Sequence, residues 1–437
     1  MPRRPRVGAA CPRRLWLLFA LLLLGATRAL AGSDADRLLF SSHDVLVAAR
    51  EAAAAGDPAL APALARLREE CADAMAAGPF TVTAKTTPPP GGDVHDYASL
   101  APYWWPDPDK PDGLPPLHRD GEVYPPSRQG DVARLESLSE NVCALALGYW
   151  YTGDEAMAGR ASLLLRTFFL DPATAMRPHL RFAQMTPGKA QGSGFGIIDA
   201  RRLPEVCDAA TLLSGSRAWS EADMAGLRAW VAAYLDWLLE SPQGRQAREA
   251  RNNQGSWYDV QVAGCALFCG RPQQAREALA RFPERVAAQI APDGAQPLEL
   301  ARTRSLSYSL SNLEALFRLM LLGDRLGLDL WHAAATDKGG PRRALEFLMP
   351  YLGQGAPWPY EQITPVGHAQ GQALLLRLAA LHYGDPAYGA AFDRVFGKKG
   401  AKRRVWLLYP AQPGGRFEAA AVSPTPPPRQ PDLWPPG

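Results

Sequence analysis

Three things are scarce in this chain of 437 residues: cysteine, long apolar runs and an excess of charge of one sign. Six cysteines are present, and the five that follow residue 31 are an odd, scattered set that does not form a complete disulfide framework. No histidine completes a zinc-binding pattern with them, so we expect neither a metal nor another cofactor. Beyond residue 31 no uncharged apolar run reaches 18 residues, which argues against a membrane-spanning helix.

The net charge is small once the first 31 residues are set aside. Those residues hold six of the 47 basic side chains and no acidic one, so 41 basic residues face 44 acidic ones in the remainder. A protein that binds nucleic acid through its phosphates normally has the opposite balance. We therefore expect no nucleic-acid partner.

Residues 1–31 have the pattern of a secretory signal peptide. An arginine-rich start precedes the apolar run Leu15–Leu24, and the segment ends Ala29-Leu30-Ala31 with small residues at the positions that a signal peptidase reads. This apolar run is much shorter than the roughly 20 residues that cross a bilayer. We predict cleavage near Ala31, a secreted or periplasmic protein, and no membrane attachment after cleavage.

Most of the remaining chain has apolar residues at helical spacing, three and four apart. Roughly a dozen helices joined as hairpins predict an all-α fold, an incomplete α/α toroid whose inner helices surround a cleft. We assign residues 32–410 to this domain and residues 411–437 to a proline-rich tail that is extended or disordered. The predicted helices are Val45–Ala55, Pro58–Ala77, Arg134–Tyr151, Asp154–Phe169, Pro204–Ser214, Glu221–Leu239, Tyr258–Cys269, Gln273–Ile290, Leu306–Leu326, Arg342–Leu352, Val366–Tyr383 and Pro386–Phe396.

Strands are few, and Phe80–Ala84 and Arg404–Tyr409 are the best candidates. Three long stretches, residues 88–129, 177–202 and 291–305, break the helical pattern. Long loops in a compact domain are usually functional or disordered. These loops contain Trp, Tyr, Arg and Gln among their Gly and Pro, so we expect them to form the walls of the cleft.

The first motif with chemical content is Pro102-Tyr103-Trp104-Trp105-Pro106. The prolines keep this segment extended or turning, so the three aromatic side chains cannot all enter one core. They fit a platform on which sugar rings stack, and equally a loop held down by aromatic anchors.

The second motif, residues 251–261, opens a helix with the amides Asn252, Asn253 and Gln254. Neutral amide donors beside the positive end of a helix can bind a carboxylate. Helix capping alone needs one such residue, and this segment supplies three amides together with Trp257 and Tyr258.

The third motif is Arg302-Thr303-Arg304, four to six residues before Tyr308. A tyrosine has an ordinary pKa near 10, and nearby cations favour its phenolate. Two arginines beside Tyr308 therefore predict a phenol that loses its proton more readily than usual. The simpler explanation is a surface arginine pair beside a core tyrosine.

Together these segments resemble the alginate-lyase-domain superfamily of polysaccharide lyases, over about Asp96 to Leu381. Tyr97-x-Ser99, the aromatic segment, Asn252-Asn253 and Arg-x-Arg with Tyr308 carry the resemblance, and the forms of the last two look closest to the branch that includes glucuronan lyases. The resemblance implies an α/α toroid without a metal. It also implies β-elimination from a uronic acid, in which the carboxylate is neutralised, the C5 proton is removed and the 4-O-linked sugar leaves.

Carried over by position, the resemblance makes Asn253 the group that neutralises the carboxylate and Tyr308 the base and acid, assisted by Arg302 or Arg304. In this superfamily a histidine commonly follows the two asparagines, and here Gln254 stands in its place. Gln254 can donate a hydrogen bond but cannot act as a base. In β-linked glucuronate or mannuronate, H5 and O4 lie on the same face, so one tyrosine can serve both steps, and we expect such a substrate.

Further candidates for substrate contact lie in the loops: Gln184, Arg201 and Glu361. The glycine-rich segment 191–196 lacks the preceding strand of a dinucleotide-binding motif. Two other functions stay open. One is a toroid that binds acidic polysaccharide without chemistry, and the other is a glycoside hydrolase with a carboxylate pair from among Glu299, Asp259 and Glu361.

Overall fold

The structure, a computed structural model, describes residues 38–333, 339–353, 355–366 and 369–410. The proposed signal peptide and the proline-rich tail lie outside this part of the chain. Within the described residues, no helix combines the length and the apolar character needed to cross a bilayer.

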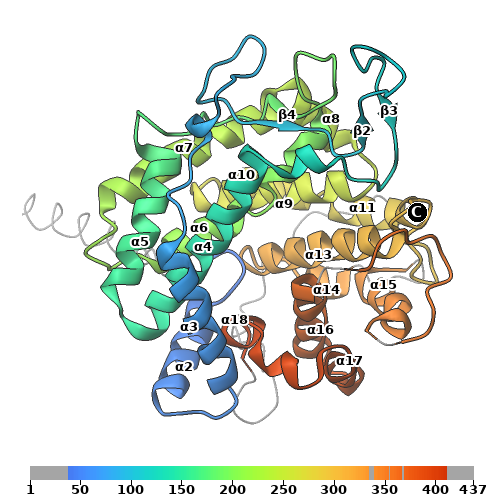
Figure 1. Ribbon diagram of the computed structural model, residues 1–437. Helices are drawn as coiled ribbons and strands as arrows, with labels where there is room; N and C mark the ends of the chain where they lie inside the picture. Colours follow the sequence, from blue (N-terminus) through green and yellow to red (C-terminus); the bar gives the residue numbers. More distant parts are fainter. Residues whose placement is uncertain (1–37, 334–338, 354, 367–368, 411–437) are drawn as a thin grey trace, which may run out of the picture.

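The fold is an α/α toroid, as the sequence predicted. Five inner helices follow one another around a central cavity, each packed against the next (Figure 1). They are α4 (Asp131–Thr152), α6 (Leu203–Leu212), α9 (Asn253–Phe268), α13 (Ser305–Asp324) and α16 (Ala369–Tyr383). In α9, 14 of the 16 residues are buried. A helix that is buried on every face lies in the core, which explains its position between inner and outer neighbours.

Outer helices cover the inner ones and complete the hairpins. They are α3 (Ala61–Ala76) and α5 (Glu155–Leu165) on α4, α7 (Glu221–Glu240) and α10 (Pro272–Leu279) on α9, α15 (Pro341–Leu348) on α13, and α17 (Pro386–Phe396) on α16. Side-chain caps begin two of these outer helices. Ser220 and Asp223 form a capping box at the start of α7, and the Asp154 side chain accepts a hydrogen bond from the Ala156 amide at the start of α5.

Short elements fill the remaining chain. They are α2 (His43–Ala54), α8 (Pro242–Glu249), α11 (Phe282–Gln289), α12 (Pro297–Leu300), α14 (Leu330–Ala333), α18 (Val405–Leu408), the 3-10 turns η2 (Val82–Ala84), η3 (Pro125–Arg128), η5 (Gly194–Ala200), η6 (Met349–Tyr351) and η7 (Gly397–Lys402), and the π-turn η4 (Arg166–Leu170). The predicted helix Gln273–Ile290 is two helices, because Pro283 lacks the amide hydrogen that would continue α10.

Both predicted strands are wrong. Residues 82–84 form the 3-10 turn η2, and residues 405–408 form helix α18, in which the Tyr409 amide bonds to the Val405 carbonyl. Alternation of apolar residues over so short a segment fits a strand and a buried helical turn equally well. The strands present lie in the long loops: β1 (Ala98–Leu100) pairs in parallel with β4 (Phe182–Met185), and β2 (Trp104–Trp105) pairs antiparallel with β3 (Leu117–His118).

The first described residues close the ring against the last ones. The Leu39 and Phe40 amides donate to the Asp208 carboxylate on α6, the Ser41 hydroxyl donates to the Leu408 carbonyl, and the Tyr409 hydroxyl donates to the Phe40 carbonyl. Burial raises the pKa of Asp208 to about 7, against the opposing effect of the two amides. Segments from the two ends of the domain thus form one wall of the central cavity.

Candidate active site

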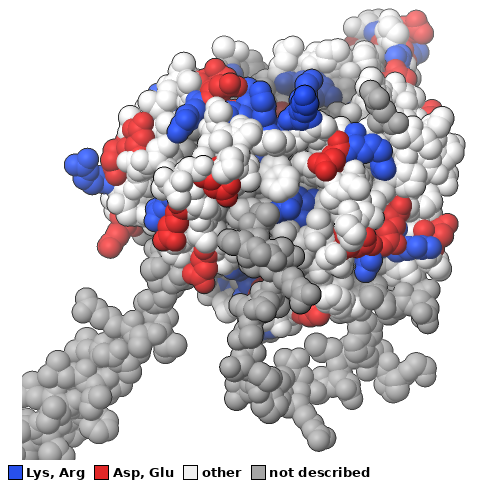
Figure 2. Space-filling model, turned by 90° about the horizontal axis from the view of Figure 1, so that it is seen from below, with Lys and Arg blue, Asp and Glu red and all other residues white. Residues whose placement is uncertain are grey.

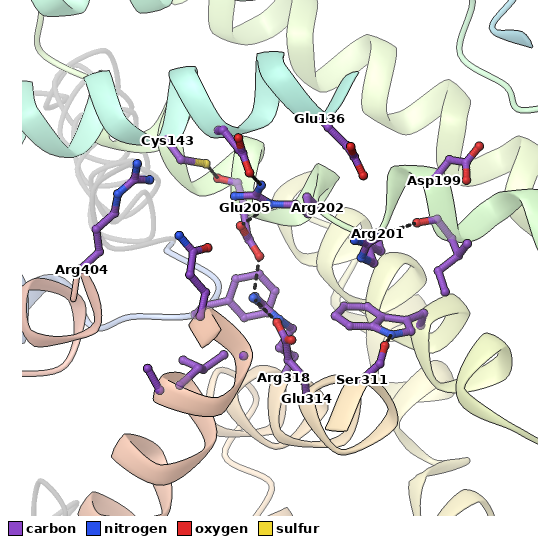
Figure 3. Close-up of a pocket in the computed structure, with 18 of the residues that line it drawn as sticks. Glu136, Cys143, Asp199, Arg201, Arg202, Glu205, Ser311, Glu314, Arg318 and Arg404 are labelled. Carbon is purple, nitrogen blue, oxygen red and sulfur yellow. Dashed lines mark hydrogen bonds and ion pairs between the residues drawn. The ribbon is translucent and has the colours of Figure 1, made fainter. Parts of the chain in front are cut away.

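A single cavity of about 1060 Å³ occupies the centre of the toroid (Figure 3). All five inner helices contribute to its lining, as do the loops that carry Tyr103, Gln184 and Arg302. The three motifs identified from the sequence meet here, although they are about 50 to 200 residues apart along the chain. No histidine is among the described residues that line this cavity.

Tyr308 lies in the first turn of α13 and lines the cavity. Its hydroxyl donates a hydrogen bond of 2.5 Å to the hydroxyl of Tyr103. The guanidinium of Arg302 lies over the Tyr308 ring, with its carbon 4.2 Å from the ring centre. Arg302 is held there by Asp120, which accepts hydrogen bonds from both Nε and Nη2.

The structure corrects the prediction that arginines make the Tyr308 phenol more acidic. Burial is the largest effect and raises the pKa of Tyr308 well above its ordinary value of 10, and the hydroxyl of Tyr103 raises it further. Arg302 acts in the predicted direction, but its charge is shared with Asp120 and does not overcome burial. Tyr308 is therefore a neutral phenol at neutral pH.

Arg304 differs from Arg302 in having no acidic partner among the described residues. It lines the cavity, and its buried Nε has no hydrogen-bond partner. Its backbone pairs with that of Gln362, and the Gln362 side-chain oxygen accepts hydrogen bonds from the Leu306 and Ser307 amides at the start of α13. Gln362, which sequence reasoning missed, thus fixes the helix turn that carries Tyr308.

Asn253 lies in the first turn of α9 and is 3% exposed. Its backbone amide and its side-chain amide both donate to the carboxylate of Glu299, at 2.8 to 3.0 Å. Burial raises the pKa of Glu299. Asn253 lines the cavity, but its side-chain donors are bonded to Glu299.

Gln254 lines the cavity beside Asn253, and its side-chain amide has no hydrogen-bond partner among the described residues. Trp257 also lines the cavity, and its indole nitrogen donates to the Ser311 hydroxyl at 3.1 Å. Asn252 instead caps α9, with its side chain accepting from the Gln254 amide. Of the three predicted amides, Gln254 has the donors available to a ligand.

Tyr258 does not contact the cavity, contrary to the prediction. It is 1% exposed, and its hydroxyl donates to the Leu238 carbonyl of α7 at 3.3 Å. Gln261, one turn further on, is fully buried and bonds to the Tyr234 hydroxyl and the Ile197 carbonyl. These two residues join α9 to its neighbours and cannot reach a substrate.

Gln184 lines the cavity where β1 and β4 pair. Its side-chain amide donates to Asp199 at 2.8 Å, and Tyr97 and Ser99 donate to the other oxygen of the same carboxylate. Gln184 also has φ 48°, an uncommon conformation for a residue with a side chain. The Tyr97-x-Ser99 motif thus holds a half-buried acid that orients Gln184. Asp199 was missed because nothing in its local sequence indicates this pairing.

The glycine-rich loop has a packing function. A Cβ on Gly192 would lie 1.9 Å from the Ala183 carbonyl oxygen, and one on Gly196 would lie 2.5 Å from it. Only glycine allows this loop to lie against β4, so these residues hold the strand that carries Gln184.

Of the three aromatic side chains in this segment, Tyr103 alone lines the cavity, together with the neighbouring Pro102. Trp104 and Trp105 form β2 outside it: Trp104 packs on His118, and the Trp105 indole donates to the Glu122 carbonyl. These contacts fit the simpler explanation, aromatic anchors that hold a loop. Glu361 also lies outside the lining, where its backbone carbonyl accepts from the Ser305 amide. Arg201 does line the cavity, beside Asp199 (Figure 3).

An ion-pair network crosses the middle of the cavity (Figure 3). We call this region, centred on the Glu205–Arg318 pair, the waist. Glu205 of α6 pairs with Arg318 of α13 at 2.5 Å and with Arg202 at 3.1 Å, and these arginines also pair with Glu314 and Glu140. Although burial alone would favour the protonated acid, Arg318 and Arg202 lower the pKa of Glu205 to about 2. At neutral pH this network is ionised, and its three carboxylates and two guanidinium groups leave a net charge of −1.

None of the carboxylates considered for hydrolysis lines the cavity. Asp259 is buried against Arg281 and Arg285, Glu361 is exposed elsewhere, and Glu299 is held by Asn253. Among the described residues, no group of three or more His, Cys, Asp and Glu side chains could hold a metal ion. The donors that face the cavity are instead a phenol, amides and guanidinium groups.

Residues 81–358 match the alginate lyase family model. A search of curated proteins finds no match. Among solved structures, an alginate lyase from Bacteroides ovatus is 36% identical with a TM-score of 0.79, and the match covers 85% of this chain and 98% of that one. Alginate lyase A1-III from Sphingomonas species A1 shares the fold at 14% identity and a TM-score of 0.55, covering 88% and 100% of the two chains. The family match over more than half of the sequence and the Bacteroides structure lead to one conclusion: this chain belongs to the alginate lyase family, and the protein is a polysaccharide lyase.

Proposed function

We propose that this lyase cleaves a β-1,4-linked polyuronate, either glucuronan or mannuronate-rich alginate, by syn β-elimination with Tyr308 as both base and acid. The observation that carries the proposal is the lining of one cavity by Tyr308, Gln254 and Arg304. The Bacteroides relative is an alginate lyase, and a histidine-to-alanine variant of the Sphingomonas enzyme is described in complex with a tetrasaccharide. An acidic polysaccharide is therefore the substrate class.

In the proposed reaction, the C6 carboxylate of the sugar is bound by Gln254 and Arg304, two lining residues whose side chains keep donors without a partner among the described residues. Asn253 supports this wall through its bonds to Glu299. Hydrogen bonds and a positive charge at the carboxylate favour the carbanion-like charge that develops when C5 loses its proton. Asn253, which the family resemblance makes the neutralising residue, joins them if Glu299 takes up a proton and releases the amide.

The ionised hydroxyl of Tyr308 then takes the C5 proton. The electron pair of the C5–H bond forms the C4–C5 double bond, the C4–O4 bond breaks, and Tyr308 returns the proton to the departing O4. Both steps occur on one face of the sugar, so a single phenol is sufficient for glucuronate and mannuronate. Guluronate, with H5 and O4 on opposite faces, requires a second group, and the described lining offers no histidine for it.

Because Tyr308 is a neutral phenol at neutral pH, only a small fraction of the free enzyme holds the reactive phenolate. We therefore expect kcat/KM to rise with pH through the mildly alkaline range, since each unit of pH increases the phenolate fraction about tenfold. We expect residues 1–31 to act as a signal peptide, which would export this activity to the periplasm or the medium.

The test is incubation of the mature protein, residues 32–437, with glucuronan, polymannuronate and polyguluronate. The ultraviolet absorbance of the unsaturated product reports elimination, and new reducing ends without that absorbance would indicate hydrolysis. Tyr308→Phe should abolish elimination while leaving polymer binding intact. Tyr360→Phe, at an exposed tyrosine outside the cavity, is the matched control. Turnover by Tyr308→Phe would remove this residue from the mechanism, and binding without any product would indicate a binding module.

A further inference from the structure

The cavity continues past the Glu205–Arg318 pair to a second mouth. Its lining there includes Lys399 and Lys402 of η7, followed by Arg403 and Arg404. In Figure 3, Arg404 lies on the opposite side of the Glu205–Arg318 pair from Arg201 and Ser311, which belong to the end near Tyr308. The two ends are thus parts of one cavity, separated by the ion-pair network around Glu205 and Arg318.

The cations at this second mouth fall into two groups. Arg404 and Arg66 pair with Glu70, and Arg66 also pairs with Glu69, so these four side chains carry no net charge. Lys399, Lys402 and Arg403 have no acidic partner among the described residues, although Arg403 packs on the Phe396 ring. Three positive charges therefore remain uncompensated where the cavity opens.

The segment that carries these cations is held in place. The Trp406 indole donates to the Gly400 carbonyl, and the Arg403 amide bonds to the same oxygen. A Cβ on Gly400 would lie 2.7 Å from the Phe392 ring of α17, so η7 packs closely on that helix. The lysines and Arg403 are therefore presented on an anchored turn rather than on a free loop.

The surrounding surface does not share this charge. Figure 2 views the molecule from below, on the side where α2, α17 and α18 lie in Figure 1, and Lys and Arg side chains are interspersed there with Asp and Glu. A general attraction for polyanions is thus weak, and the positive charge is local to the cavity. Lysine, a mobile point charge on a long stem, suits carboxylates whose positions vary along a flexible polymer.

We propose that this mouth, formed by Lys399, Lys402 and Arg403, is a second carboxylate-binding subsite that holds uronate units of the same polysaccharide chain, remote from the bond cleaved at Tyr308. The proposal rests on the proposed function, since its ligand is the polyuronate substrate. A substrate long enough to pass the waist gains contacts that a short one cannot make. The subsite thus favours polymer over short oligosaccharides.

The experiment compares the triple variant Lys399→Ala, Lys402→Ala, Arg403→Ala with a control that removes three exposed lysines outside the cavity: Lys110→Ala, Lys189→Ala and Lys398→Ala. Both lose the same net charge, and Lys398 is the immediate neighbour of Lys399. The double variant Lys399→Ala, Lys402→Ala leaves the Arg403–Phe396 contact intact and keeps the test valid if the triple variant does not fold. Initial rates are measured on the cleaved polymer and on its trisaccharide, at low and high salt.

Each exposed cation–carboxylate contact contributes a factor of about two, so the triple variant should raise KM for polymer about eightfold at low salt. KM for the trisaccharide, and KM for polymer in the control, should stay within about twofold of the wild type. The polymer effect should shrink at high salt, where exposed charges are screened. Equal KM values in the triple variant and the control, or an equal loss on the trisaccharide, would overturn the subsite.

Retention of the uncleaved polymer on immobilised protein distinguishes the two proposals. If the wild-type protein retains polyuronate without cleaving it and the triple variant does not retain it, the subsite stands and the proposed reaction is refuted. Wild-type protein that neither cleaves nor retains any polyuronate would overturn both.

Discussion

Replacement of Glu205 by glutamine should lower the free energy of unfolding by about 3 kcal/mol at pH 7. Arg318 and Arg202 hold the pKa of Glu205 at about 2, against an ordinary value of 4.5. A lower pKa in the folded state means that folding favours the ionised acid, and this difference corresponds to about 3 kcal/mol at about 1.4 kcal/mol per pH unit. The same magnitude is typical when one partner of a buried ion pair is removed.

The stabilisation has a defined pH window. Because the folded-state pKa is the lower one, the contribution of Glu205 is fully present above about pH 4.5 and is lost as the pH falls toward 2. Urea unfolding followed by tryptophan fluorescence should therefore show a wild-type advantage of about 3 kcal/mol at pH 7 and less than about half of that at pH 3.

Glu136→Gln is the control, because Glu136 lines the same cavity and is exposed, with no ion pair among the described residues. It should change the free energy of unfolding by less than about 0.5 kcal/mol at either pH. Two results would refute the reasoning that ionised groups stabilise this part of the fold. One is a difference in free energy of unfolding between wild type and Glu205→Gln that is equal at pH 7 and pH 3. The other is a difference below about 1 kcal/mol at pH 7.

Three further changes test other parts of the site. Tyr103→Phe removes the hydroxyl that raises the pKa of Tyr308, so the alkaline rise of kcat/KM should move to lower pH, and a move to higher pH would contradict the assigned contact. Asn253→Ala leaves the buried Glu299 carboxylate with only the backbone amide of residue 253 as a donor, and should lower the free energy of unfolding in urea by about 2 to 4 kcal/mol. The control Asn252→Ala removes only a helix cap and should lower it by about 1 kcal/mol. Equal losses in the two variants would argue against the Glu299 contact. Gly192→Ala should lower the free energy of unfolding by about 3 kcal/mol, because the new Cβ would collide with the Ala183 carbonyl. The control Gly159→Ala, in open space on α5, should raise the free energy of unfolding by about 0.5 to 1 kcal/mol. A Gly192 variant as stable as the wild type would refute the packing function.

Local signals predicted the helical hairpins because each one is written in a short stretch of sequence. The apolar spacing of α4 and α13 predicted long helices, and the capping residues Ser220 and Asp154 mark the starts of α7 and α5 within a few residues. The number of helical hairpins predicted the toroid, and the family resemblance implied that the three motifs would meet in it. Residues so far apart in sequence meet only through the packing of the whole ring.

The errors at the site have a common cause. The spacing of Gln254 and Tyr258 places them on one side of α9, but periodicity cannot say which side faces the cavity when the helix is buried on nearly every face. The acidity of Tyr308 was misjudged because Asp120, 182 residues from Arg302 along the chain, shares the arginine's charge. Asp199, Glu299 and Gln362 likewise act through distant partners that no local pattern reveals.

The bonds that tie Phe40 and Ser41 to Tyr409 and Leu408 join positions more than 360 residues apart. A growing chain can complete this closure only after almost the entire domain has been synthesised. Until then α2 lacks α18, the helix that packs against it, and the cavity lacks the wall that residues 405–409 form beside Phe40. Truncation shortly before Tyr409 should therefore leave an open helical array that lacks the finished catalytic chamber, even though every residue of the Tyr308 motif is present.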